Sequence, residues 1–243
     1  MGKARIRREL RAARRVRRGL VGISRTPWPL PAAFGEETLG LLASWRQVLA
    51  TLGPAIPPAS AVSADPPSPF VPAPTASSAP RSGLTAALFW PTLVEPDVRG
   101  IVARAGRCLL PVLTDEGGAA LADPMWGWCD LSDAGLVGPR ASSQLHSPDP
   151  HLPLQPSAAR LPPSVLACAD VVLAPALAVD ASGTRLGQGG GWYDRALLHV
   201  REGVPVVAAV FDEEVLPAGT IPRETHDRSV NAVITPTRVL LLD

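Results

Sequence analysis

Hydrophobic and basic positions follow a helical period over the first twenty residues of the chain. At 100° per residue, the apolar stripe of this segment contains Ile6, Leu10, Ala13, Val16 and Leu20. A separate stripe of basic side chains contains Lys3, Arg7, Arg11, Arg14 and Arg18. The pattern predicts an amphipathic helix that docks through its apolar face and presents charge on the other.

A second helical pattern covers residues 36–52, and Gly53 ends it. The pattern then stops, because residues 54–80 hold nine prolines and seven alanines. This stretch lacks the large apolar side chains that offset the entropy of ordering a chain. We predict a disordered Pro/Ala-rich insertion over residues 54–82 and a long proline-rich loop over residues 138–163.

Short apolar runs bounded by proline and glycine predict strands in the rest of the chain. These runs occupy residues 84–90, 108–113, 170–175, 204–211, 232–235 and 239–242. Helical patterns begin near Glu95 and Tyr193, between successive strands. Strands that alternate with helices form a mostly parallel sheet. We therefore predict one α/β domain over residues 1–243, doubly wound with a Rossmann-like three-layer architecture and a basic N-terminal helix.

The net charge of +1 conceals a strong asymmetry. Residues 1–18 contain nine basic groups and one acid, a net charge of +8, whereas the other 225 residues contain 14 basic and 21 acidic groups, a net charge of −7. A basic arm on an acidic body favours an anion, either nucleic acid, membrane lipid, a nucleotide or the protein's own acidic surface. The arm lacks interleaved aromatic residues, so we expect no nucleic-acid partner.

Several other classes of function are disfavoured by the sequence. The three cysteines form no Cys-x-x-Cys pair, which argues against both a disulfide framework and a zinc cage. The apolar runs are shorter than the roughly 18 residues of a membrane helix, and no apolar segment follows the basic N-terminus. We therefore expect a cytoplasmic protein with no membrane partner. We read His146, His151 and His199 as structural or surface residues, and Trp126 and Trp128 as core packing.

The sharpest local feature is the glycine-rich segment from Gly183 to Asp194. Four of its glycines fall within five residues, ahead of a helix, where the backbone can point several N–H groups at one anion. Arg185 can add a bidentate contact to phosphate, and Asp194 suits a Mg²⁺ ion bridging carboxylate and phosphate. The segment lacks the lysine of a Walker motif, and Trp192 occupies a glycine position of the dinucleotide fingerprint. A purely structural role for the glycines remains the alternative at this point.

The segment as a whole resembles the signature of the 5-formyltetrahydrofolate cyclo-ligase (5,10-methenyltetrahydrofolate synthetase) family, usually written G-x-R-L-G-x-G-x-G-Y-Y-D. The matching positions are Gly183, Arg185, Leu186, Gly187, Gly189, Gly191, Tyr193 and Asp194. Three further segments are similar to the family in order and spacing. They are Lys3 to Arg7, Phe89 to Glu95, and Ile221 to Asp227.

The resemblance implies an enzyme that uses ATP and Mg²⁺ to close 5-formyltetrahydrofolate into 5,10-methenyltetrahydrofolate, releasing ADP and phosphate. Together with the glycine cradle, it implies an ATP site of Lys3, Arg7, Gly183, Arg185, Gly187, Gly189, Gly190, Gly191 and Tyr193. It implies a reduced-folate site of Glu95, Gln188 and Trp192, a metal site of Asp194 and Asp227, and a catalytic role for Arg185. We expect a monomer.

Three positions depart from the family pattern. Trp192 replaces the first of two tyrosines, so a hydroxyl is lost while stacking area is kept. Asn231 replaces a common aspartate, and Gln188 replaces what is often a basic or aromatic residue. The alternative that these departures motivate is a non-catalytic nucleotide- or phosphate-binding module on the same fold.

Overall fold

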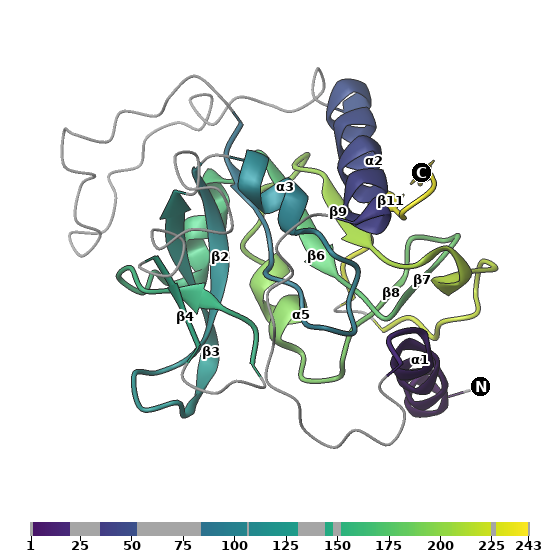
Figure 1. The fold of residues 1–243 in the computed structure, drawn as a ribbon, viewed down its shortest axis with the longest axis horizontal. Helices are drawn as coiled ribbons and strands as arrows, with labels where there is room; N and C mark the ends of the chain where they lie inside the picture. Colours follow the sequence, from purple (N-terminus) through teal and green to yellow (C-terminus); the bar gives the residue numbers. More distant parts are fainter. Residues whose placement is uncertain are drawn as a thin grey trace.

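A computed structural model describes residues 2–19, 35–52, 84–105, 107–130, 144–147, 152–224 and 227–242 (Figure 1). Its helices are α1 Lys3–Arg17, α2 Glu36–Leu52, α3 Arg99–Arg104 and α5 Trp192–Leu197, with 3₁₀ turns η3 Pro163–Cys168 and η4 Asp212–Glu214. The strands in the first part of the chain are β1 Ala86–Ala87, β2 Arg107–Thr114, β3 Ala120–Asp130, β4 Leu145–His146 and β5 Gln155–Pro156. The later strands are β6 Val171–Pro175, β7 Ala178–Asp180, β8 Arg185–Leu186, β9 Val206–Ala209, β10 Val215–Leu216, β11 Ala232–Ile234 and β12 Val239–Leu241.

Seven strands form the central sheet in the order β12-β11-β9-β6-β1-β2-β3 (Figure 1). The inner pairs are parallel, and only the two edge pairs, β2 with β3 and β11 with β12, are antiparallel. From β1 the chain moves outward to β2, and it later returns to β6 on the other side of β1 before continuing to β9. The prediction of a doubly wound, mostly parallel sheet is confirmed, and the strand order reverses between β1 and β6.

Alternate residues of the sheet belong to two separate cores. Leu88, Leu110, Leu173 and Ile234 pack with residues of α2 and α3. The residues just before them, Ala87, Leu109, Val172 and Val233, pack with α5 and η3. Side chains alternate across a strand, so continuous apolar runs place one core on each face and give a three-layer molecule.

The first helix docks differently from the prediction. Ile6 is buried as expected, but Ala13 is exposed and Val16 is 65% exposed, while Arg14 is 1% exposed. The expectation that the apolar stripe alone would dock is therefore wrong. The basic stripe faces the body because that surface offers carboxylates and carbonyl oxygens to pair with it.

Some elements lie where no strand was predicted. The edge strand β3 and the ribbon of β4 and β5 are additional, and the ribbon lies inside the expected proline-rich loop. A hairpin of β7 and β8 follows β6. The glycine-rich segment therefore begins in the turn of this hairpin, and Arg185 lies on its second strand. The insertion at 54–82 and His151 lie outside the described residues. Among the helices that the structure describes, none is long and apolar enough to cross a membrane.

Candidate functional site

A cavity of about 260 Å³ lies at the carboxyl ends of β1 and β6, where the strand order reverses. Phe89 and Trp90 follow β1, and Ala176 follows β6. Open α/β sheets bind ligands at this kind of crevice, outside the carboxyl ends of the strands. The rest of its wall includes the glycine segment and the start of α5, so the cavity brings together two motifs that are about 100 residues apart in the chain.

The glycine segment forms one side of the cavity with its backbone donors free. In the described part of the chain, no backbone N–H of residues 187–191 donates to a protein acceptor. Carbonyl oxygens of the same segment are engaged by α1, because Arg7 Nε donates to Gly187 O at 3.0 Å and Arg11 Nη2 donates to Gln188 O. Arg11 Nε also donates to Gln188 Oε1 at 3.0 Å. The basic helix thus holds the outer side of the loop and leaves its N–H groups for an anion.

Two glycines of this segment are required for backbone conformation. A Cβ at Gly187 would lie 2.9 Å from Nη1 of Arg185, the end of a side chain that could shift. Gly189 and Gly191 have φ values of +101° and +65°, a region that side chains disfavour. The glycines therefore have the structural role that was the alternative explanation. The backbone conformation that they allow also leaves the N–H groups of the loop free.

Arg185 lies beneath the loop with its side chain 4% exposed. Its guanidinium donates to Asp194 Oδ1 and, at 3.1 Å, to the carbonyl oxygen of Pro175. Nε of Arg185 is buried without a hydrogen-bond partner. Asp194 is 31% exposed and lines the cavity with one carboxylate oxygen paired to Arg185. The predicted phosphate ligand and one predicted metal ligand are therefore side by side.

Lys3 lies at the start of α1 between two acidic side chains. Its Nζ is 2.8 Å from Asp227 Oδ2 and 2.9 Å from Glu224 Oε1. Burial by itself would lower the pKa of Lys3, but the hydrogen bonds to Asp227 and Glu224 outweigh it and raise the pKa above 10.5. Lys3 is thus a fixed cation that ties α1 to the chain just before β11, outside the cavity lining.

A buried ion pair anchors the other end of α1. Arg14 donates through Nε and Nη2 to the two oxygens of Glu214 at 2.6 and 2.7 Å, with side-chain exposures of 1% and 2%. Nη2 also donates to the carbonyl oxygen of Ala176, which lines the cavity. The Phe211 ring lies beneath Arg14 and Arg17, with its centroid 5.6 and 4.4 Å from their guanidinium carbons. Arg14 therefore fixes α1 relative to the cavity wall.

The start of α5 adds aromatic side chains to the cavity wall. The Trp192 ring lies 5.2 Å from Trp126 and 4.8 Å from Tyr193, centroid to centroid. Trp126 is fully buried, which confirms its reading as a core residue. Nε1 of Trp192 and the hydroxyl of Tyr193 are buried without hydrogen-bond partners. Burial raises the pKa of Tyr193 well above 10, and the nearby Glu95 charge adds to that rise.

Glu95 completes this end of the cavity. It is 8% exposed, and its Oε2 accepts hydrogen bonds from the backbone N–H and the hydroxyl of Thr92, both at 2.8 Å. Both residues line the cavity. A buried carboxylate held this way is an oriented acceptor for N–H donors of a flat ligand.

Four of the predicted site residues do not line the cavity: Lys3 and Arg7 of α1, Gly183 and Asp227. Gly183 lies in the turn between β7 and β8, where its carbonyl accepts from Val230 N–H at 3.0 Å, and it does not line the cavity. Asp227 pairs with Lys3 and does not line the cavity either. Asn231 is also distant, since its Oδ1 accepts from Val206 N–H at 2.8 Å at the start of β9. Its departure from the family pattern therefore does not alter the cavity wall.

A magnesium site was predicted from Asp194 and Asp227. Among the described residues, no group of three or more His, Cys, Asp or Glu is arranged to hold a metal. Mg²⁺ is usually held by only one or two carboxylates together with substrate phosphates. The partly exposed Asp194, next to the free N–H groups of the glycine segment, fits that mode. Asp227 does not fit that mode, because it lies outside the cavity lining and its Oδ2 accepts a hydrogen bond from Lys3.

Several residues in or next to the site were not identified from the sequence. Arg11 and Arg14 were grouped with the solvent-facing stripe, and Pro153 and Leu154, which line the cavity, fell in the proline-rich loop. The basic spacing of 3, 7, 11 and 14 is the one signal that could have indicated a functional face of α1.

Comparison of this chain with known proteins identifies its family. The model of the 5-formyltetrahydrofolate cyclo-ligase family matches residues 97–236. The 5-formyltetrahydrofolate cyclo-ligase of Mycolicibacterium smegmatis is 36% identical over 161 residues, which are 65% of this chain and 76% of the relative. The mitochondrial 5-formyltetrahydrofolate cyclo-ligase of Arabidopsis thaliana is 33% identical over 79 residues, 29% of this chain and 28% of the relative.

Solved structures of similar shape agree with the fold. A 5,10-methenyltetrahydrofolate synthetase of Aquifex aeolicus has a TM-score of 0.60 at 18% identity, over 100% of this chain and 93% of the other. One from Mycoplasma pneumoniae has a TM-score of 0.51 at 14% identity, over 97% and 99%. The family match and the Mycolicibacterium relative, on a cavity built from the matching motifs, show that this chain belongs to the 5-formyltetrahydrofolate cyclo-ligase family.

Proposed function

We propose that the protein uses ATP to convert 5-formyltetrahydrofolate to 5,10-methenyltetrahydrofolate, with release of ADP and phosphate. The observation that supports this most directly is the row of free N–H groups at residues 187–191 in the same cavity as the aromatic wall. Free backbone donors suit phosphate, and an aromatic wall suits a flat heterocycle. Family membership supports the pairing of these two ligands.

The two ends of the cavity suggest how the substrates are arranged. We place the ATP phosphates at the glycine segment, within reach of Arg185 and of α1 through Lys3 and Arg7. We place the pterin against Trp192, with Glu95 as acceptor for its N–H groups.

The chemistry needs no protein nucleophile. The formyl oxygen attacks the γ-phosphorus, and the bond to ADP breaks. N10 then attacks the activated formyl carbon, its proton leaves, and the C–O bond breaks with release of phosphate. Phosphoryl transfer depends on positioning and on neutralising charge, which the N–H groups and Arg185 supply. Burial raises the pKa of Cys129 to about 12, so this thiol is not an alternative nucleophile.

When bound with the nucleotide, Mg²⁺ supplies further neutralisation of phosphate charge. Asp194 would hold it through the carboxylate oxygen that Arg185 does not engage. Arg185 holds Asp194 in position for that role.

A turnover assay tests the proposal. The full-length protein with Mg-ATP and 5-formyltetrahydrofolate should produce the ultraviolet absorbance of the methenyl product, and omission of ATP should abolish it. Arg185→Ala should reduce kcat by about 10²–10³, the usual cost of losing a charge-stabilising donor. Saturable ATP binding in calorimetry with no product at saturating folate would instead establish the non-catalytic nucleotide-binding alternative, which Trp192 motivates.

A further inference from the structure

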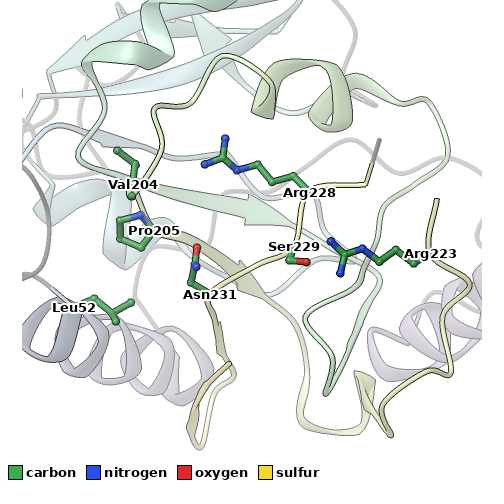
Figure 2. A pocket seen from close by; sticks show the side chains of 8 residues that line it. Leu52, Val204, Pro205, Arg223, Arg228, Ser229 and Asn231 are labelled. Atoms are coloured by element: carbon green, nitrogen blue, oxygen red, sulfur yellow. The ribbon is translucent and has the colours of Figure 1, made fainter. Parts of the chain in front are cut away.

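A second cavity, of about 390 Å³, lies at the other end of the central sheet (Figure 2). Its walls include Gly203, Val204 and Pro205, which precede β9, and Ser229 and Asn231, which precede β11. Because β9 and β11 are parallel, this cavity is at their amino ends, whereas the folate-family cavity is at the carboxyl ends of β1 and β6. The two cavities share no lining residue.

Two arginines in this wall have no carboxylate partner. Neither Arg223 nor Arg228 forms an ion pair with any residue that the structure describes, and the described lining contains no Asp or Glu. Arg228 is half-buried. In Figure 2 the Arg223 side chain ends beside Ser229, and the Arg228 side chain extends toward Val204. A half-buried cation without a counter-ion is unusual, because removing charge from water is costly.

Arg228 retains donors for a ligand. Its Nη1 donates to the carbonyl oxygens of Leu197 and Val200 at 2.9 and 2.8 Å, and Nη2 donates to that of Arg201 at 3.2 Å. A guanidinium has five N–H groups, so these bonds leave the Nε–H and one Nη2–H without a described partner. Two such donors on one guanidinium suit the paired oxygens of a phosphate or carboxylate.

The remaining polar groups are also donors. Asn231 accepts from Val206 N–H through Oδ1, which leaves its Nδ2 group without a described partner. The hydroxyl of Ser229 has no described partner. The other wall is apolar, formed by Leu52 at the end of α2 with Val204 and Pro205 (Figure 2). The occupant must therefore combine an oxyanion with an apolar portion.

We propose that this second cavity binds a small organic anion, with a phosphate or carboxylate group at Arg223, Arg228, Ser229 and Asn231 and an apolar part against Leu52, Val204 and Pro205. The site is separate from the one proposed for ATP and folate. It rests on two arginines without a described carboxylate partner and on a lining that offers hydrogen-bond donors but no Asp or Glu, and it does not depend on the catalytic proposal.

Phenyl phosphate is the probe for this site. Benzoate tests a carboxylate in place of the phosphate, and phenol tests the apolar ring without the anion. We would titrate the ¹⁵N-labelled full-length protein and follow the Arg228 Nε–H, the Asn231 side-chain amide and the Ser229 backbone amide by NMR. Saturable shifts of these resonances are expected with phenyl phosphate or benzoate, in the presence of saturating ATP. The stronger of the two anions identifies phosphate or carboxylate as the preferred group.

Arg223→Ala should weaken phenyl phosphate binding about tenfold, the effect of about 1.4 kcal/mol for a charged hydrogen bond. Arg223 is exposed and forms no described hydrogen bond or ion pair, so its replacement leaves the fold intact. Arg46→Ala, which removes an exposed arginine of α2 that does not line the cavity, is the matched control and should change nothing. Shifts confined to residues 187–191, equal binding of phenol, or equal weakening by both variants would overturn the proposal.

Discussion

The two long helices of the molecule are held to different sheets by different forces, α2 to the central sheet and α1 to the smaller sheet of β10, β7 and β8. Helix α2 buries Leu41, Leu42, Trp45 and Val48 against one face of the central sheet. Helix α1 buries mainly Ile6 and Arg14, and its contacts with the body are hydrogen bonds and ion pairs along its basic face. Figure 1 shows α1 beside β7 and β8, apart from α2.

This difference separates a structural helix from one that contributes to the site. Apolar packing holds α2 whatever binds elsewhere. Two of the side chains that hold α1, in contrast, are Arg7 and Arg11, which contact the glycine segment, so docking of the helix and the proposed ligand binding involve the same loop. The basic arm was expected to bind an anion, and the structure shows that it binds the protein's own acidic surface. A nucleotide is the second anion that we propose for it.

The largest effect is expected from Arg14→Ala, which leaves the buried Glu214 carboxylate without its partner. Removing one member of a buried pair costs about 3–5 kcal/mol of unfolding free energy. Urea unfolding measures the loss. The double variant Arg14→Met with Glu214→Leu should recover most of it, because neither charge then remains, and a double variant as unstable as the single one would contradict the account.

Leu41→Ala in α2 should cost about 2–5 kcal/mol, because the side chain is fully buried and its removal leaves a cavity. Leu39→Ala on the same helix is the control, since Leu39 is 51% exposed and its loss should cost less than about 0.5 kcal/mol. Both variants should keep the wild-type KM for ATP while folded. A changed KM would show that α2 also takes part in the site.

Asp180 provides a pH-dependent contribution of intermediate size. Burial would raise the pKa of Asp180, but hydrogen bonds from Ser182, Ile221 and Thr184 outweigh it and lower the pKa below 3.8. The stabilisation is complete above the unfolded pKa of about 3.9 and is lost as pH falls through the folded pKa. Asp180→Asn should lower stability at pH 7 by about 1.5–3 kcal/mol, and acid titration of the variant should show a flatter fall below pH 4.

The smallest effect is expected at the rim of the α1 interface, where Arg17 pairs with the half-exposed Glu213. Glu213→Gln should cost at most about 1 kcal/mol, because exposed ion pairs are screened by water and salt. Unfolding at about 0.05 M and 1 M salt should bring the variant and the wild type together. If the two proteins still differ in unfolding free energy at 1 M salt, the Arg17–Glu213 pair is protected from solvent in the same way as the buried Arg14–Glu214 pair.

Most of the central sheet could be predicted, because buried parallel strands are continuous apolar runs. Strand β3 could not, since Pro124 and Gly127 interrupt its apolar pattern and the strand owes its place to pairing with β2. The β7–β8 hairpin was hidden for a similar reason, because its second strand, Arg185–Leu186, has only two residues.

The candidate site could be predicted at its glycine segment and at Glu95, where local motifs define it. The docking of α1 could not, because a helical pattern assigns Arg14 to solvent, and its partner Glu214 is 200 residues away. The separation of Gly183 and Asn231 from the cavity depends on turns between strands, which spacing in the sequence does not reveal.

We propose that Lys3 and Arg7 of α1 contribute to ATP binding, and steady-state kinetics of Lys3→Met and Arg7→Met would test this role. Arg8→Met, an exposed position on the same helix, is the matched control. We expect each of the first two variants to raise the KM for ATP about tenfold or more, the effect of losing a charged contact, and to leave the KM for the folate within about twofold. An unchanged KM for ATP, or a rise confined to the folate, would contradict it.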